Sequence, residues 1–577
     1  MSYLKEDRQG EKMELTENAQ KVLRARYLLR DPEGNVTETP TEMFRRIAQS
    51  IAAADMIYHE EASSSEEAFY RLLSSLRFLP NSPTIMNAGK SAGQLAACFV
   101  LPVEDSMRSI FDTLKNAALI LQSGGGTGFS FSRLRPRSDI VRSTGGVASG
   151  PVSFMKIYNA ATDVIKQGGA RRGANMGILR VDHPDIIEFV RLKRKGGELS
   201  NFNISVAVPD AFMEAVKNDT EYNLVNPRTG AVAGHMRAGG IFDEIVESAW
   251  LTGDPGLIFI DSVNRGNPTP GIGSFESTNP CGEQPLLPFE ACVLGSLNLA
   301  KYVLNGKVDF DSLGADVTVA VHFLDDAIDV NVYPLHEVER MHKGNRKIGL
   351  GVMGWADMLI LLGLPYNHRK SHELARSVMK FIHDKARRAS AILAEKRGVF
   401  PNFGGSVYDM PGVARLRNAT LTTIAPTGTL SIIAGCSSGI EPLFAIAYKR
   451  LILDTTLYEV NKIFTELALK EGFYSEELMA KIMKKGTLRG LKEIPARVRR
   501  LFRTALEIPP DDHLEMQAAF QEFTDNAVSK TINLPANSKR EDVGTIYLRA
   551  YERGLKGITV FRYGSKTGTM MKFSDVD

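Results

Sequence analysis

Apolar residues recur with a helical period in several stretches of the chain. The clearest stretch carries a Ser-x-x-Glu capping pattern at Ser64, places its apolar side chains on one face, and meets a helix-breaking proline at Pro80. Gly398 follows another such stretch, in the place where a glycine commonly ends a helix. The spacing predicts helices over residues 41–54, 64–79, 107–122, 153–166 and 371–397.

The pattern changes after residue 80. From residue 81 onward, short apolar runs are separated by clusters of Gly, Ser, Thr and Asn, with amphipathic helices between them. Strands that alternate with helices are typical of the α/β class. No convincing linker divides residues 81–560, so we expect a helical region over 1–80 and one α/β domain over 81–577.

The composition is that of an ordinary soluble protein. The 577 residues are 43% hydrophobic and 24% charged, with 70 Lys and Arg against 67 Asp and Glu, a net charge of +3. This composition excludes collagen-like and wholly disordered chains. The chain also lacks the strong excess of positive charge that is typical of proteins that bind DNA or RNA.

Cysteine usage and the N-terminal segment both favour a cytoplasmic protein. Four cysteines are too few to crosslink such a chain, and the N-terminus has no apolar core of a signal peptide. Residues 421–440 are uncharged but contain a proline, three glycines and seven Ser or Thr. We interpret them as a loop plus a buried element, and we expect no contact with a membrane.

Four glycine-containing segments invite comparison with nucleotide-binding motifs. The sequence at Gly89 lacks the first glycine of a P-loop. Gly349 begins a G-x-G-x-x-G pattern, but the charged segment before it is not the buried strand that a dinucleotide site needs. Residues 425–431, APTGTLS, offer backbone N–H groups and hydroxyls that suit a diphosphate. Residues 167–173, taken alone, favour an exposed basic turn.

One short segment carries most of the candidate chemistry. Asn279, Cys281 and Glu283 stand at i, i+2 and i+4, and the intervening proline and glycine favour an irregular loop on which all three converge. Cys98 and Cys292 lie in apolar runs and are expected at buried strand positions, where a single cysteine is best explained as packing. Without a C-x-x-C or a suitable His pair, no metal site is predicted.

Eight segments in the same order resemble the vitamin B12-dependent (class II) ribonucleotide reductases. They span residues 81–445 and are NSPTIMNAG, ACFVLPVEDSM, GGGTGFSFSRLRP, STGGVASGPVSFM, QGGARRGANMGIL, NPCGEQPLLPFEACVLGSLNL, RKIGLGVMGWADML and APTGTLSIIAGCSSGIEPLF. By this resemblance the GLGVMG block belongs to a helix-packing pattern of the family and not to a dinucleotide site.

The resemblance implies a ten-stranded α/β barrel of two parallel five-stranded halves, with Cys281 on a finger loop through its centre. Cys281 would become the thiyl radical that abstracts the 3′-hydrogen of a ribonucleotide. Glu283 would accept the 3′-hydroxyl proton, and Asn279 would hold the sugar. Cys98 and Cys292 would supply two reducing equivalents and close to a disulfide, so they must meet within disulfide geometry.

The resemblance also implies two nucleotide sites. The substrate-binding residues would be Ser82, Ala97, Pro426, Thr427, Gly428, Thr429 and Ser431. A deoxynucleoside triphosphate effector would bind at a homodimer interface and relay its identity to the substrate base. The effector-binding residues would be Asp105, Ser106, Arg142, Gly145, Gly146, Lys166, Gln167 and Arg171.

Residues 557–565, GITVFRYGS, indicate which radical source the protein uses. Class I relatives pass a radical through two adjacent tyrosines in this region, and this stretch has no such pair. Adenosylcobalamin is therefore the expected cofactor. The alternatives are a class I-type catalytic subunit that awaits a radical-generating partner, an inactive deoxynucleotide sensor, and a dehydrogenase.

Two departures from the family affect turnover and control. No cysteine follows Cys436, so we expect a small dithiol or a thioredoxin-like protein to reduce the disulfide. No ATP-cone precedes the helical region, so we expect specificity control without overall shut-off by dATP. Dimeric relatives favour diphosphate substrates, although the sequence leaves triphosphates open.

Overall fold

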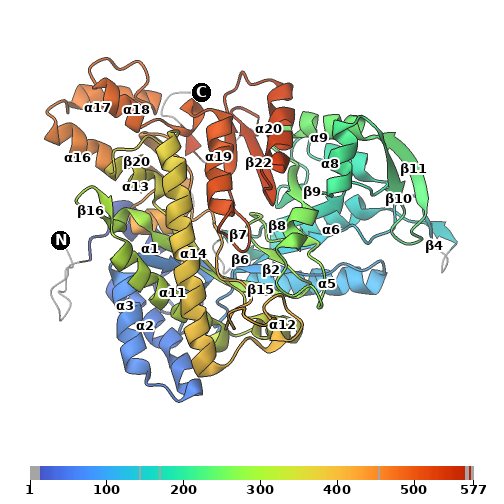
Figure 1. Cartoon of the computed structure of the whole chain (residues 1–577), viewed down its shortest axis with the longest axis horizontal. Helices are drawn as coiled ribbons and strands as arrows, with labels where there is room; N and C mark the ends of the chain where they lie inside the picture. The colour runs from blue at the N-terminus through green and yellow to red at the C-terminus, as the bar shows by residue number, and fades with distance from the viewer. Residues whose placement is uncertain (1–12, 142–144, 168–170, 453–454, 566–570, 573–577) are drawn as a thin grey trace.

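The computed structural model describes residues 13–141, 145–167, 171–452, 455–565 and 571–572. Its N-terminal part is helical and packs against the long helix α11 (Phe310–Val330), as Figure 1 shows. The elements of this part are α1 (Glu17–Arg26), α2 (Pro40–Ala52), η1 (Ala53–Tyr58), α3 (Ala62–Ser74) and α4 (Ser82–Asn87).

The third of these helices differs from its prediction at both ends. α3 begins after Glu61, so Ser64 lies inside the helix and does not cap it. The helix ends at Ser74, and Leu76 takes a left-handed conformation with φ of 57°. The chain can then turn into β1 (Phe78–Pro80), which pairs with a later strand of the barrel. Pairing of this edge strand overrides the helical pattern of residues 75–79.

The other predicted helices agree more closely with the structure. α5 spans Met107–Gln122, as expected, and α6 (Pro151–Val164) begins two residues before its predicted start. α14 (Arg369–Arg397) ends directly before Gly398, whose φ of 84° is favourable only for glycine.

Two runs of strands form the barrel wall. In the first half each strand is parallel to the next, in the order β2 (Cys98–Val100), β3 (Gly126–Ser130), β8 (Asn175–Arg180), β9 (Phe202–Val208) and β12 (Gly256–Phe259). The second half contains two parallel pairs, β15 (Ala291–Asn298) with β18 (Ile348–Met353), and β21 (Thr531–Leu534) with β22 (Gly557–Arg562).

The two halves join at antiparallel seams. β2 pairs with β15, and β12 pairs with β22. Residues 420–424 close the remaining gap, because Leu350 bridges to Thr422 and Ile424 bridges to Val528. The structure therefore confirms the expected α/β fold, with a ten-stranded mixed sheet at its centre.

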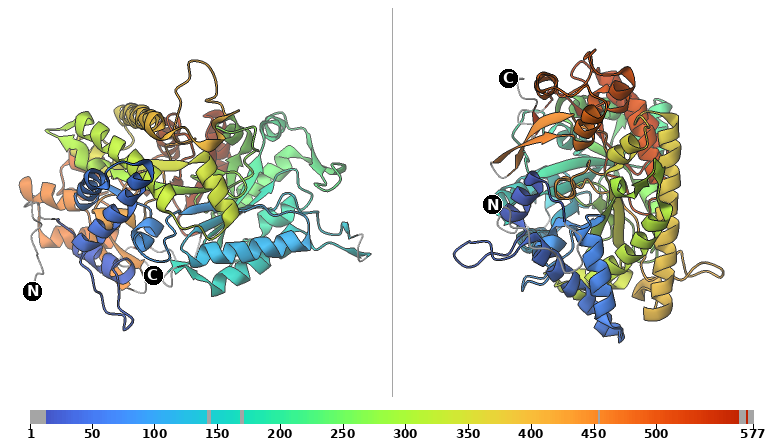
Figure 2. Two further views of the ribbon diagram at one scale, coloured as in Figure 1. Left: turned by 90° about the horizontal axis from the view of Figure 1, so that it is seen from below. Right: turned by 90° about the vertical axis from the view of Figure 1, so that its left-hand side faces the viewer.

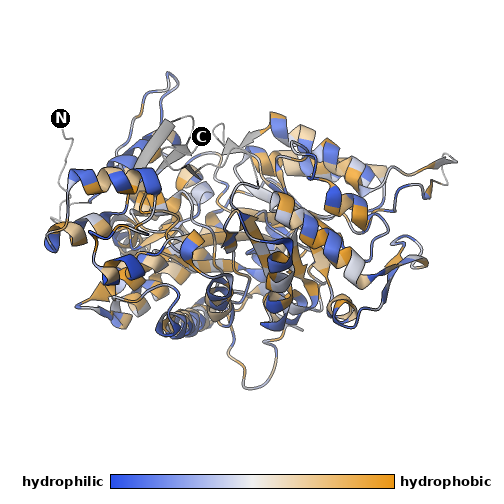
Figure 3. Cartoon of the chain, turned by 90° about the horizontal axis from the view of Figure 1, so that it is seen from above, coloured by the Kyte–Doolittle hydropathy of each residue, from blue (hydrophilic) through white to orange (hydrophobic). Residues whose placement is uncertain are grey.

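Helices cover the outside of this sheet. α11 (Phe310–Val330) and α14 pack along one side, while α9 (Ala238–Thr252) and α20 (Arg540–Glu552) pack together at another (Figure 2). In Figure 3 the outer helices carry both hydrophilic and hydrophobic residues, as expected for amphipathic helices that cover a core. Among the described residues, no helix is long and apolar enough to cross a bilayer.

The first five residues of the GLGVMG block lie in β18, which is buried along its whole length and packs against α11. Gly354 caps the start of α13 (Trp355–Leu361). A side chain on Gly351 would lie 2.3 Å from the backbone oxygen of Thr423, so the neighbouring segment can approach only because this position is glycine. The first two glycines of the block lie within the strand and not in the turn after it, where a dinucleotide phosphate would bind.

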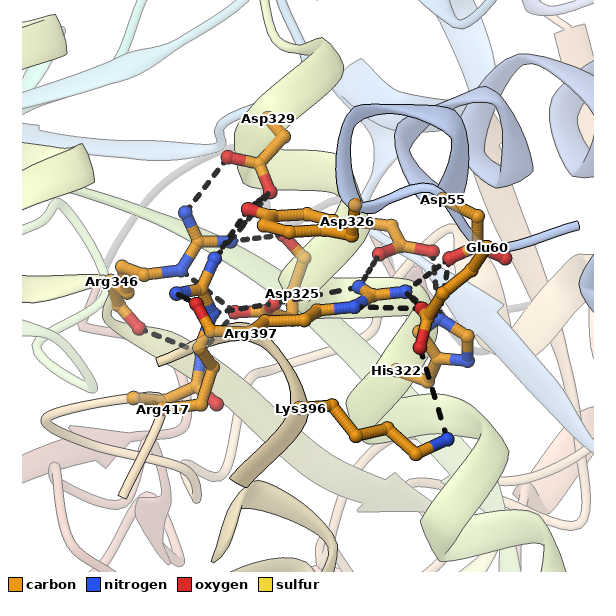
Figure 4. Close-up of polar contacts among 12 residues, drawn as sticks. Asp55, Glu60, His322, Asp325, Asp326, Asp329, Arg346, Lys396, Arg397 and Arg417 are labelled. Atoms are coloured by element: carbon orange, nitrogen blue, oxygen red, sulfur yellow. Dashed lines mark hydrogen bonds and ion pairs between the residues drawn. The ribbon is translucent and has the colours of Figure 1, made fainter. Parts of the chain in front are cut away.

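A buried ionic cluster joins the N-terminal helices to the barrel (Figure 4). Arg397, at the end of α14, donates to Asp326 on α11 at 2.5 Å and also to Asp55 and Glu60, which lie in and after η1. His322 completes this group, which we call the Arg397 cluster, through contacts of 2.9 Å to Asp55 and 3.1 Å to Asp326.

The Arg397 cluster is stabilised by compensating charges. Asp55, Glu60 and His322 present possible ligand atoms within 4.8 Å of one another, but the Arg397 guanidinium already binds both carboxylates. Burial alone would lower the pKa of His322, yet its hydrogen bonds to Asp326 and Asp55 raise it to about 9. The cluster therefore holds two parts of the molecule together by paired charges.

Candidate active site

A short hairpin carries the Asn279–Cys281–Glu283 segment. Strands β13 (Ser277–Thr278) and β14 (Pro285–Leu286) pair antiparallel and leave residues 279–284 as the loop between them. The backbone N–H of Asn279 donates to the oxygen of Gln284 at 3.1 Å, and Gly282 turns the chain with φ of 83°. The loop is irregular, as the sequence predicted.

Strands from both halves of the barrel hold this loop. A side chain on Gly128 of β3 would lie 1.7 Å from the backbone oxygen of Thr278, so the hairpin packs directly against that strand. From β9, the Asn203 side chain donates to the oxygen of Pro280 at 2.8 Å. In the second half, Thr423 donates to the backbone oxygen of Glu283 at 3.0 Å. The contacts agree with a finger loop inside the barrel.

Cys98 and Cys292 lie opposite one another across the β2–β15 seam. They are directly paired in the antiparallel register, and both are buried. Residues opposite one another in such a pair have Cα atoms about 4.5–5.5 Å apart, which is within the usual range for a disulfide. The structure confirms both strand positions and brings together two thiols that are far apart in sequence.

Asn279 connects the loop to this thiol pair. Its side-chain nitrogen donates to Sγ of Cys98 at 3.1 Å, and its side-chain oxygen accepts the backbone N–H of Gln284 at 3.0 Å. These two contacts fix the orientation of the carboxamide and place it between the finger loop and β2.

Glu283 is a buried carboxyl group without a full set of partners. Its Oε2 accepts no hydrogen bond from the described residues. Burial raises the pKa of Glu283 to about 7, although a hydrogen bond with Asn279 opposes the shift. Cys281, two residues earlier, is exposed. The loop thus presents an accessible thiol beside a carboxylate that can accept a proton near neutral pH.

Burial also governs the two strand thiols. It raises the pKa of both Cys98 and Cys292 well above the usual range, and the charge of Glu283 raises both further. Both thiols are therefore protonated at neutral pH, the form in which a thiol can deliver hydrogen.

The loop predicted to bind phosphates follows the strand-like segment 420–424. Thr427 takes a left-handed conformation with φ of 54°, and its hydroxyl accepts the backbone N–H of Gly439 at 2.7 Å. The hydroxyls of Ser431 and Ser438 lie 2.9 Å apart. Pro426, Gly428 and Thr429 lie in the same turn, which leads into α15 (Leu430–Ala434).

The other expected substrate-binding residues lie near the thiol pair. Ala97 precedes Cys98 and packs in one apolar cluster with both thiols, and Ala425 packs there as well. Ser82 begins α4, and its hydroxyl lies 2.9 Å from that of Tyr27. The backbone N–H of Asn81 donates to Leu294 of β15 at 2.8 Å, which fixes the start of this helix against the barrel.

Sequence reasoning missed two residues that the structure adds. Arg26, on α1, donates to the hydroxyl of Thr429 at 3.5 Å and so brings a cation to the phosphate loop from the N-terminal part. Lys347 is a buried cation next to Cys292, whose thiol donates to its backbone oxygen at 3.5 Å. Nothing in the sequence indicated either contact, because the partners come from distant parts of the chain.

The expected effector residues lie around α5 and α6. Asp105 accepts the Arg135 side chain at 2.9 Å, and Ser106 caps α5 by accepting the backbone N–H of Ser109 at 3.2 Å. Gly145 has φ of 65°, and Gly146 of β5 (Gly146–Val147) pairs with β4 (Ile140–Val141).

The remaining effector residues follow α6 directly. β6 (Lys166–Gln167) pairs antiparallel with β7 (Arg171–Arg172), and β6 lies against α5. The predicted contacts of Lys166, Gln167 and Arg171 stay predictions, and Arg142 lies outside the described residues.

Comparisons with known proteins define the family. The barrel domain of ribonucleotide reductases matches residues 96–415 and 411–561, and their all-alpha domain matches residues 13–93. The α subunit of the class Id ribonucleotide reductase of Actinobacillus ureae has a similar structure, with a TM-score of 0.79 and 25% identity over 95% of this chain and 97% of its own. The chain therefore belongs to the ribonucleotide reductase family.

Two curated relatives narrow the class. The vitamin B12-dependent ribonucleoside-diphosphate reductases of Thermoplasma acidophilum and Mycobacterium tuberculosis are each 50% identical to it, over 96% and 98% of this chain and 80% of theirs. This identity places the chain among the vitamin B12-dependent ribonucleoside-diphosphate reductases, and it confirms the activity and cofactor class expected from the sequence.

Proposed function

We propose that the chain reduces ribonucleoside diphosphates to 2′-deoxyribonucleotides by a thiyl radical on Cys281. The observation that carries this proposal is the placement of two buried, paired thiols beside a loop that presents Asn279, Cys281 and Glu283. A radical reductase needs this set, whereas a nucleotide sensor does not.

Glu283 and Asn279 act on the 3′ position. Cys281, as a thiyl radical, abstracts the 3′-hydrogen and returns it at the end of the cycle. Glu283 accepts the proton of the 3′-hydroxyl, which its pKa of about 7 permits at neutral pH. The carboxamide of Asn279, which the Gln284 backbone orients, holds the sugar.

Cys98 and Cys292 act on the 2′ position. Together they give up two electrons and two protons, and the 2′-hydroxyl leaves as water. The products are the deoxyribonucleotide, water and a disulfide between the two sulfur atoms. Their register on β2 and β15 allows that bond without movement of the strands.

The exposed thiol of Cys281 fits adenosylcobalamin as the radical source. Asn279, Pro280 and Glu283 are buried, so Cys281 is the most exposed residue of this loop toward a group outside it. When bound, the cofactor supplies the initiating radical. Strand β22 contains Phe561 but no tyrosine pair, which disfavours a class I-type catalytic subunit.

Substrate phosphates would bind the turn that contains Thr427, Gly428, Thr429 and Ser431. Backbone N–H groups and hydroxyls form this surface, and Arg26 adds a positive charge. Ser82, Ala97 and Pro426 would contact the rest of the nucleotide.

We also propose a homodimer with effector sites at its interface. Several large apolar side chains of α5 and α6 are exposed. They are Met107, Phe111, Leu119, Ile157 and Val164. Grouped apolar side chains on a protein surface are typical of an interface with another protein. Deoxynucleoside triphosphates bound near Asp105 and Ser106 would select the substrate. We further propose that the helical region ends at residue 80 and that the protein is cytoplasmic. The reductant of the disulfide would be a thioredoxin-like protein or a small dithiol.

A direct assay tests this function. CDP and CTP are incubated in the dark with dithiothreitol and deoxynucleotide effectors, with and without adenosylcobalamin, and deoxycytidine nucleotides are measured. Product only with the cofactor supports the proposal and identifies the phosphate state of the substrate. No product from folded, effector-binding protein would favour a subunit that needs a radical-generating partner, or a sensor.

A further inference from the structure

One residue of the finger loop has a buried polar side chain without partners. Gln284 directly follows Glu283 and is 0% exposed. Neither the nitrogen nor the oxygen of its carboxamide has a hydrogen-bond partner among the described residues. Oε2 of Glu283 also lacks a partner there, and no other two consecutive residues in the described part of the chain both carry such atoms. Unpartnered polar atoms therefore concentrate at this point of the loop.

The backbone of Gln284 is fixed at both of its polar groups. Its N–H donates to the side-chain oxygen of Asn279 at 3.0 Å, and its carbonyl oxygen accepts the backbone N–H of Asn279 at 3.1 Å. Pro285, the next residue, begins β14 and pairs with Thr278 of β13. The hairpin therefore holds Gln284 in place through its backbone, and the shape of the loop does not depend on the carboxamide.

The side chain of Gln284 reaches the barrel wall at β18. A side chain on Gly349 of that strand would lie 2.8 Å from Nε2 of Gln284, so this glycine leaves the room that the carboxamide occupies. Methyl groups of Leu294 and Thr423 border the same space, at 2.5 Å and 2.7 Å from the added side chain. Leu294 belongs to the apolar cluster that contains both strand thiols. The carboxamide therefore lies next to that cluster.

The neighbours of the carboxamide do not satisfy it. The side chain of Leu294 has only carbon atoms, and the hydroxyl of Thr423 donates to the backbone oxygen of Glu283 at 3.0 Å. A buried amide that has lost its hydrogen bonds to bulk water costs free energy unless another partner replaces them. An apolar side chain would fill the same place without this cost, so packing alone does not explain a glutamine here.

The two unpartnered atoms define the chemistry of the partner that fits them. Nε2 needs an acceptor and Oε1 needs a donor, so the partner must offer both. Phosphate and carboxylate oxygens only accept hydrogen bonds, and ammonium groups only donate them. A neutral hydroxyl group, from water or from ribose, does both.

We propose that the Gln284 carboxamide binds a hydroxyl group inside the barrel, next to the cluster that contains the strand thiols. The hydroxyl accepts a hydrogen bond from Nε2 and donates one to Oε1. It belongs either to a resident water molecule or to the ribose of the substrate. The ribose source rests on the proposed function, whereas the water source does not.

Nucleotides that differ only in their ribose hydroxyls test the ribose source. CDP, 2′-deoxycytidine diphosphate and 2′,3′-dideoxycytidine diphosphate are titrated calorimetrically into the full chain and into Gln284→Met, without adenosylcobalamin so that no turnover occurs. If the carboxamide binds a ribose hydroxyl, the variant should bind CDP about tenfold more weakly and the dideoxynucleotide equally well, because a hydrogen bond is lost only where the hydroxyl is present. The 2′-deoxynucleotide then identifies which hydroxyl is bound.

Gln517→Met controls for the loss of a buried glutamine. Gln517, on α19 (Pro510–Gln521), is 1% exposed, and its Nε2 donates to the backbone oxygen of Gly557 at 2.9 Å. Because this glutamine lies outside the finger loop, its variant should bind all three nucleotides as the original protein does. A disturbed finger loop in Gln284→Met would instead weaken the binding of all three nucleotides to the same extent.

A crystal structure of the nucleotide-free protein tests the water source. If Gln284→Met shows no difference among the three nucleotides, a water molecule within about 3.2 Å of both Nε2 and Oε1 would assign the hydroxyl to water. No such water and no difference among the nucleotides would overturn the inference. If the original protein binds no CDP, the proposed function fails instead, and the crystal structure still decides for or against the water.

Discussion

Asp55 of the Arg397 cluster and Glu283 of the finger loop are both buried carboxyl groups, but their pKa values shift in opposite directions. The contrast concerns Asp55 and not its neighbour Asp326, whose pKa burial raises to about 7. In the cluster, burial would raise the pKa of Asp55, yet hydrogen bonds from His322 and Arg397 hold it well below the usual range. In the loop, burial raises the pKa of Glu283 to about 7, and Oε2 accepts no bond from the described residues. Paired charge stabilises the assembly of the two parts, whereas an unsatisfied carboxyl is prepared to take a proton.

The largest effect on activity should come from substitution of Cys281 in the finger loop, which should change turnover but not stability. Cys281→Ser should lower turnover by more than about a thousandfold, because a serine hydroxyl does not form the radical. Since the side chain is exposed, stability should change by less than about 0.5 kcal/mol. Deoxynucleotide formation and thermal unfolding by circular dichroism measure both. Residual turnover near the original rate would place the radical elsewhere.

Arg397→Met breaks the cluster at its centre. It removes the guanidinium that pairs with Asp55 and Asp326 and leaves His322 as the cation that contacts both, so we expect a loss of about 3–5 kcal/mol in the free energy of unfolding. Denaturant titration measures this loss, and Arg369→Met, which removes an exposed arginine paired with Glu373, is the control. A loss no larger than that of the control would show that the cluster contributes little.

Glu283→Gln tests whether the buried carboxyl group of the finger loop acts as the proton acceptor. Without the proton acceptor, kcat should fall about a hundredfold. In the original protein activity should rise with pH through about 7, as Glu283 loses its proton, and the variant should lose this dependence. A pH profile of kcat with CDP makes the comparison.

The same substitution should also affect stability. Because the pKa of Glu283 is raised in the folded state, folding favours the protonated form, and stability falls as pH rises from about 4.5 to about 7. Above pH 7 the uncharged glutamine should therefore make the protein more stable, by about 3 kcal/mol at 1.4 kcal/mol per pKa unit. Equal stability of the two proteins at pH 8 would contradict the burial of an uncompensated charge.

The smallest effect should come from titration of His322. Its pKa is raised from 6.5 to about 9, so its contribution to stability is complete below pH 6.5 and is lost as pH rises through about 9. We expect a loss of about 2 kcal/mol across that window, allowing for partial exposure. Denaturant titrations at pH 6 and pH 9.5 measure it, and His322→Asn should remove the difference.

Much of the fold could be predicted from local patterns. The α5 boundaries, the end of α14 at Gly398 and the strand positions of Cys98 and Cys292 depend on periodicity and apolar runs, which a sequence displays directly. The barrel itself could be expected only from the family resemblance, because its closure depends on isolated bridges of residues 420–424 to strands that are distant in sequence and that no local pattern displays.

The site shows the same division between local and distant information. The order Asn279–Cys281–Glu283 is visible in the sequence, and so is the loop that carries it. The raised pKa of Glu283 is not, because it results from burial by strands of both halves. Lys347 was missed for a related reason, since its partner Glu290 lies 57 residues away.

The pairing of Cys98 with Cys292 has a consequence for how the protein can change over evolution. The two thiols depend on the register of β2 against β15, and a slip of one residue would turn one of them to the opposite face of the sheet. The chain between them can therefore lengthen or shorten in its loops without disturbing the chemistry. A single insertion within either strand would separate the sulfur atoms and end turnover.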